Sequence, residues 1–134
     1  MRIVIKQKII MNDFYYRKLD VYHLSKKMVA DIYQITKTFP PSELYGLTNQ
    51  IQRAAISVPS NIAEGLGRFA IKERLHFIEI AYGSLMEVMC QLEIAELLNY
   101  ITNETTTLLE KDITNIAKML SGLRRNLQEK NNFK

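Results

Sequence analysis

Two acid–histidine pairs are the side chains in this 134-residue chain whose spacing could hold a metal ion. Glu73 precedes His76 by three residues, and Asp20 precedes His23 by the same interval. Pairs of the Glu-x-x-His type build di-metal sites when they face the core of a helical bundle. On a helical wheel, however, Glu73 and both histidines fall far from the apolar stripe of their helices. We therefore expect exposed charged faces here, with no metal and no cofactor.

Nucleophilic and phosphate-loop chemistry has little support. The single cysteine, Cys90, has no histidine near it in the sequence, and we expect its thiol to be buried and inert. One cysteine excludes a disulfide framework and fits a reducing cytoplasm. The segment 64–68 has two glycines but neither the Walker nor the dinucleotide-binding spacing. We therefore expect a non-enzymatic, cytoplasmic protein, and a metal-dependent enzyme is the least favoured hypothesis.

Basic side chains form a more coherent pattern, although the net charge is only +4. Stripes of Lys and Arg attract phosphate backbones without reading the base sequence. An ordinary solvated helix face remains the alternative for any single one of these residues. The candidate nucleic-acid contacts are a stripe at seven-residue spacing and a cluster around Gly65: Lys111, Lys118 and Arg125, and Arg53, Arg68, Lys72 and Arg74.

Four amphipathic helices must position these residues. Apolar residues recur at intervals of three and four over residues 15–38, 42–64, 71–99 and 103–127, which is the helical period. Pro40 and Pro41 end the first helix, Ser42 is a candidate cap for the second, and Pro59 predicts a kink or a restart inside it. Thr102 or Asn103 caps the fourth. The third helix carries its main stripe on Ile71, Leu75, Ile78, Tyr82, Leu85, Met89 and Leu92.

Length and composition favour one all-α domain. Five glycines and three prolines are too few for the turns of a β-rich fold. Four long helices with short connections predict an antiparallel up-and-down four-helix bundle over residues 13–128. Residues 1–12 would be an N-terminal extension, either a short strand or a flexible arm, and residues 129–134 a frayed tail. No segment is apolar enough to predict a membrane span.

A second set of apolar residues lies away from the main stripes of the first and third helices. Aligned apolar side chains on an outer face are typical of a subunit interface. We therefore expect a homo-oligomer. Its interface would use residues of both helices: Tyr22, Val29 and Tyr33 from the first, and Phe77, Ile80, Ser84 and Val88 from the third.

The run QRAAISVPSNIAEG and the stretch AYGSLMEVMCQLEIAELLNYI resemble the four-helix-bundle family of 23S ribosomal RNA intervening-sequence proteins. That family includes the accessory variability protein of diversity-generating retroelements. The resemblance covers about residues 13–128. It implies a homopentameric ring with a basic surface that binds nucleic acid, and it implies no catalytic residue. The motif positions that carry over are Arg53, Ser57, Pro59, Asn61, Glu64, Gly65, Gly67 and Arg68.

Two departures from the family pattern each remove a positive charge. The family commonly has two arginines where this chain has Gln52 and Arg53, and Ala-Arg-Gly-Ser where residues 81–84 read Ala-Tyr-Gly-Ser. We therefore expect this chain to bind nucleic acid more weakly than its relatives do. Within the motif, Ser57 and Asn61 are expected to satisfy backbone groups near Pro59, and Glu64 to pair with an arginine one turn on.

Two functional hypotheses therefore lead. The first is an oligomeric bundle, expected to be a pentamer, that binds RNA or DNA through its basic surface. The alternative is a protein-interaction scaffold in which the same ring docks a partner, such as a reverse transcriptase, without touching nucleic acid.

Overall fold

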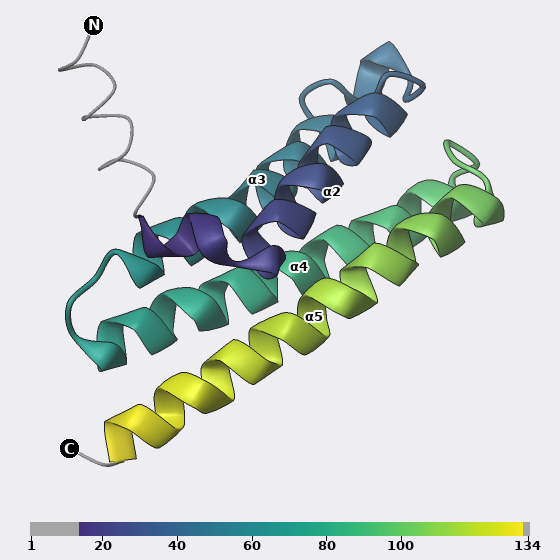
Figure 1. Ribbon diagram of the computed structural model, residues 1–134. Coiled ribbons are helices and arrows are strands. Elements are labelled where there is room, and N and C mark those ends of the chain that lie inside the picture. The colour runs from purple at the N-terminus through teal and green to yellow at the C-terminus, as the bar shows by residue number, and fades with distance from the viewer. Residues whose placement is uncertain (1–13, 133–134) are drawn as a thin grey trace, which may run out of the picture.

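The computed structural model describes residues 14–132, which form four α-helices and two single turns of 3-10 helix. The elements follow the chain as η1 (Tyr15–Lys18), α2 (Asp20–Thr36), η2 (Pro41–Glu43), α3 (Leu47–Leu66), α4 (Ile71–Leu97) and α5 (Asn103–Asn132). Neighbouring helices run in opposite directions, and α4 packs against both α3 and α5 (Figure 1). The all-α prediction and the four helices are confirmed.

The first two helices begin later than the sequence pattern predicts. Leu19 has an extended backbone and separates η1 from α2, so the long first helix begins at Asp20 rather than Tyr15. Pro41 starts the single turn η2, in which Ser42 caps nothing, and α3 begins only at Leu47. A carboxylate oxygen of Glu43 accepts the first backbone N–H of α3 at 3.3 Å, which takes the role predicted for Ser42.

The connection before α3 is tied to the connection before α5. Tyr100 donates its hydroxyl hydrogen to Oε2 of Glu43 at 2.8 Å, and its ring packs at 5.5 Å from that of Phe39. The hydrogen bond to Glu43 raises the pKa of Tyr100 above its ordinary value, because it favours the neutral phenol. These contacts hold together the end of the bundle where α2 ends and α5 begins.

Pro59 is buried inside α3, and the helix continues through it from Leu47 to Leu66, so of the predicted kink or restart the restart does not occur. Asn61 donates from Nδ2 to the carbonyl oxygen of Ser57 at 2.7 Å and to its Oγ at 2.8 Å. The Oγ of Ser57 also lies 2.8 Å from that of Ser84 in α4. The motif residues around Pro59 therefore connect α3 to α4, a structural role that the sequence indicated only for the local backbone.

The far end of the chain is more helical than expected. Thr102 accepts the backbone N–H of Thr105 on its hydroxyl at 3.2 Å, which confirms it as the cap of α5. The helix then continues to Asn132, so residues 129–132 belong to α5 and not to a frayed tail. Residues 1–12, predicted as an extension, lie outside the described part of the chain.

Two of the seven residues predicted for the oligomer interface lie in the core, because α4 has two core-facing sides. Val88 is fully buried and Ser84 is 8% exposed, since α4 lies between α3 and α5 and must be apolar toward each. Tyr22 and Val29 are partly buried against the same core. Phe77 is partly buried beside Gly65. Of the seven residues, only Tyr33 and Ile80 are exposed, at 40% and 37%.

Gly65 marks the closest approach of α3 to α4. A Cβ placed on Gly65 would lie 2.6 Å from Cβ of Phe77 and 3.4 Å from the carbonyl oxygen of Arg74. We expect Gly65→Ala to lower the free energy of unfolding by about 1–3 kcal/mol, as overpacking of a core does. Gly83→Ala in α4 is the matched control, because a Cβ there meets nothing within 4 Å.

Urea denaturation followed by circular dichroism measures both variants. Gly83→Ala is expected to gain about 0.5–1 kcal/mol, the usual advantage of Ala over Gly inside a helix. Equal stability changes in the two variants would contradict the close packing of α3 on α4 at Gly65.

Candidate nucleic-acid interface

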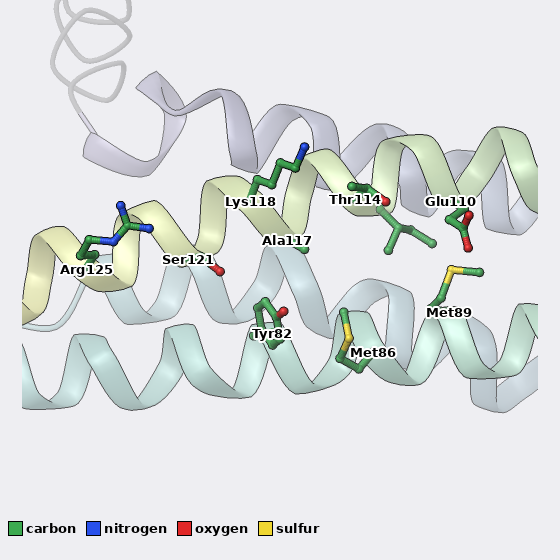
Figure 2. A pocket seen from close by; sticks show the side chains of 10 residues that line it. Tyr82, Met86, Met89, Glu110, Thr114, Ala117, Lys118, Ser121 and Arg125 are labelled. Atoms are coloured by element: carbon green, nitrogen blue, oxygen red, sulfur yellow. The ribbon is translucent and has the colours of Figure 1, made fainter.

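An open groove of about 440 Å³ runs along the outside of the bundle between α4 and α5. Its floor comes from one side of α4, where residues 82, 86 and 89 recur at helical spacing. The side wall of the groove comes from α5. The lining residues are Tyr82, Met86, Met89, Glu110, Ile113, Thr114, Ala117, Lys118, Ser121 and Arg125 (Figure 2).

A second recess of about 270 Å³ shares Tyr82 and Ser121 with this groove. The two therefore form one continuous surface along α4 and α5, which we call the α4–α5 groove. Arg124 also lines the second recess, where its Nε donates to Oε1 of Glu79 at 3.2 Å. That pair engages Arg124 within the protein and ties the C-terminal half of α5 to α4.

The floor and the rim of the α4–α5 groove differ in chemistry. Tyr82 is 39% exposed and Met86 is 40% exposed, so an aromatic ring and a thioether chain remain accessible. Tyr82, Met86 and Met89 rise from α4 toward α5, while Lys118 and Arg125 project from the outer side of α5 (Figure 2). The groove thus combines an apolar floor with a basic rim.

The predicted basic stripe on α5 divides between two grooves. Lys118 and Arg125 line the α4–α5 groove, whereas Lys111 lines a different groove of about 480 Å³ between α2 and α5. Residues seven apart on a straight α-helix drift by only about 20° around its axis, so the division reflects the neighbouring helix, α2 beside Lys111 and α4 beside the other two residues. The structure therefore places two of the three predicted residues, Lys118 and Arg125, in the same groove.

Acidic groups line both grooves, Asp31 and Asp112 beside Lys111 and Glu110 in the groove of Lys118 and Arg125. Lys27 donates to Asp31 and to Asp112, each at 2.9 Å, and these residues line the same groove as Lys111. The hydrogen bonds to Asp112 and then to Asp31 raise the pKa of Lys27. Within residues 14–132, no ion pair engages Lys118 or Arg125. Because Lys118 and Arg125 share one groove whereas Lys111 stands apart from them, the rim of the α4–α5 groove is the better placed for phosphates.

The second predicted basic cluster does not form one surface. Arg53 lines a polar groove between α3 and α4 with Ser57, Ser84 and Glu87. Lys72 is exposed and lines a shallow recess with Arg68 at the start of α4. These two recesses share no lining residue, so the cluster is divided.

Two arginines of that cluster are engaged inside the protein. Arg68 donates to Glu64 at 3.1 Å, which confirms the predicted pair, and its guanidinium carbon lies 4.9 Å from the ring centroid of Phe77. Arg74 donates from Nε to the backbone carbonyl of Arg68 at 2.6 Å. Both side chains hold the connection between α3 and α4, and this leaves them less available to a ligand.

The acid–histidine pairs point outward, as the helical wheel predicts. Glu73, His76, Asp20 and His23 are all exposed. Nε2 of His23 lies 2.6 Å from the backbone oxygen of Arg17. Over residues 14–132, no group of three or more His, Cys, Asp or Glu side chains is placed to hold a metal ion.

Cys90 is exposed, so its predicted burial is wrong. The buried side of α4 comprises Ala81, Ser84, Leu85, Val88 and other residues that face α3 and α5, and position 90 falls outside it. The same misplacement affects Tyr82, which the sequence pattern assigns to the core stripe. Its exposed ring is the feature of the groove that the sequence did not reveal.

Comparison with known families identifies the family of this chain. A family model of the 23S rRNA-intervening sequence protein matches residues 17–122. The chain belongs to this family. Its match includes α2, α3, α4 and the first two-thirds of α5, and hence most of the α4–α5 groove. Arg125 lies just beyond the matched range.

A solved structure has the same fold. It is a protein of unknown function from the S23 ribosomal protein family of Bacteroides thetaiotaomicron, with a TM-score of 0.73 and 24% sequence identity. The alignment covers 78% of this chain and 95% of that protein. No curated protein matches the chain. In the described residues, no helix is long and apolar enough to cross a membrane.

Proposed function

We propose that this member of the 23S rRNA-intervening sequence family binds the backbone of RNA or DNA, without catalysis, through the basic rim of the α4–α5 groove. One observation carries the proposal. Lys118 and Arg125 lie on the rim of the same open groove, and no ion pair engages either of them in the described part of the chain. Lys and Arg placed in this way neutralise phosphates and release their counterions.

We further propose that the chain acts in the cytoplasm as a homopentamer. The family resemblance supports the ring, and α4 supports an interface, because Ile80, Ile94 and Leu97 remain exposed on it at 37%, 40% and 79%. A ring would present five copies of the basic rim. Light scattering is expected to give five times the 15.6 kDa of one chain, and a monomeric mass would contradict assembly.

Fluorescence polarisation with a labelled RNA and a DNA of the same sequence tests nucleic-acid binding. We expect both to bind with dissociation constants in the micromolar range at physiological salt, the usual range of backbone-directed binding. A protein that leaves both probes free at low salt would contradict the proposal.

A protein-interaction scaffold is the second candidate, and one end of the bundle favours it. Leu44 and Tyr45 before α3 are 54% and 90% exposed, and Leu97 and Leu98 at the end of α4 are 79% and 46% exposed. The Glu43–Tyr100 hydrogen bond places these two connections at the same end. Such a patch fits a protein partner, such as a reverse transcriptase. Retention of a protein partner after nuclease treatment would favour this candidate.

A further inference from the structure

The floor of the α4–α5 groove offers a surface that phosphate binding does not use. Tyr82 is shared by both recesses of the groove and is 39% exposed. Within residues 14–132, no hydrogen bond engages its hydroxyl and no other ring stacks on it. The exposed thioether of Met86 lies one turn further along the same floor. The ring is therefore accessible and unpartnered at the centre of the groove.

The width of the groove limits what can enter it. The recess has a volume of about 440 Å³ between two packed helices, whose axes are typically about 8–10 Å apart, so it is too small for a duplex. In a duplex the faces of the bases are stacked on one another, and only phosphates and base edges meet a protein. An unstacked base, by contrast, can place its face against an aromatic side chain.

The positive side chains of the rim are spaced along α5 in the direction that a nucleic-acid strand lying on this helix would follow. Lys118 and Arg125 stand two turns apart, which is about 10 Å along the helix. They project from α5 on the side away from α4, whereas Tyr82 rises from α4 toward α5 (Figure 2). Glu110 lines the groove near one end, and the Arg124–Glu79 pair closes the other. Positive charge therefore lies along α5, on the rim of the groove whose floor carries Tyr82.

We propose that the α4–α5 groove binds single-stranded nucleic acid, with an unstacked base against the ring of Tyr82 and the adjoining phosphates on Lys118 and Arg125. This inference rests on the proposed nucleic-acid function and adds a preference for single strands to it. The basic rim supplies affinity for any phosphate backbone, whereas the Tyr82 floor supplies the discrimination between single strands and duplexes.

Polarisation binding of one labelled RNA, alone and annealed to its complement, tests the inference with three variants. Tyr82→Ala is expected to lower single-strand affinity about tenfold, as loss of one base-stacking contact does, and to leave duplex affinity within about twofold. Tyr82→Phe keeps the ring and should retain the wild-type preference. Tyr33→Ala is the matched control, because Tyr33 is 40% exposed on α2, away from the groove.

The outcomes separate this inference from the function on which it rests. Wild-type protein that binds both probes equally, with Tyr82→Ala changing neither, would overturn the base contact and leave backbone binding in place. Equal losses for both probes in Tyr82→Ala would also overturn it, because a stacking contact cannot act on a duplex. Absence of binding by the wild-type protein would overturn both proposals. Loss of a nuclease-resistant protein partner in Tyr82→Ala, with nucleic-acid binding unchanged, would assign the groove to a protein instead.

Discussion

Replacing both Lys118 and Arg125 by glutamine is expected to weaken binding of single-stranded RNA by about 25-fold at 0.1 M salt, because each phosphate contact on a single strand releases about 0.7 counterions. Both residues line the α4–α5 groove, and no ion pair within residues 14–132 is lost with them. Glutamine keeps much of the length and polarity of each side chain. The loss therefore reports the charge at the rim and not a change in packing. Polarisation with a labelled RNA measures it.

A second double variant controls for the overall charge of the protein. Lys37→Gln with Lys130→Gln removes the same two charges from exposed positions at the ends of α2 and α5. We expect its affinity to stay within about threefold of the wild type, since neither residue lines the groove and distant exposed charges are screened. Equal losses in the two double variants would mean that net charge, and not the groove, governs binding.

Val88→Asp is expected to lower the free energy of unfolding by roughly 4 kcal/mol or more, which would leave much of the chain unfolded. The side chain of Val88 is fully buried between α3 and α4, where a carboxylate would have no partner. Ile80→Asp is the matched control on the same helix, because Ile80 is 37% exposed. It should cost less than about 1 kcal/mol of monomer stability. Urea denaturation followed by circular dichroism compares the two.

The two variants also separate the bundle core from a subunit interface. If Val88 lay at an interface, Val88→Asp would give a folded chain of reduced mass in light scattering, with an unchanged urea midpoint. That result would contradict the packing of α4 described above. A folded but dissociated Ile80→Asp variant would instead assign the exposed side of α4 to the oligomer.

Sequence patterning predicted the number of helices and their order because both depend on local signals. Apolar residues at three- and four-residue intervals mark each helix, and Pro40 and Thr102 mark two of the boundaries. The Glu64–Arg68 pair was also predictable, since residues four apart on a helix are neighbours. These features require no knowledge of how the helices pack on one another.

Tertiary packing decided the features that the sequence did not reveal. A helical wheel with one core-facing stripe cannot describe α4, which is buried against α3 on one side and α5 on the other. Val88 and Ser84 were therefore assigned to an interface, and Tyr82 and Cys90 to the core. The division of the basic stripe between two grooves likewise depends on the neighbours of α5. The α4–α5 groove is consequently visible only in the folded chain.

The salt dependence of RNA binding tests the proposed function most directly. We expect the logarithm of the association constant to fall linearly with the logarithm of salt concentration, with a slope steeper by about 1.4 for the wild type than for the Lys118→Gln and Arg125→Gln double variant. That difference corresponds to two phosphate contacts on a single strand. A flat salt dependence for the wild type, or the same slope for both proteins, would contradict phosphate binding at the rim of the α4–α5 groove.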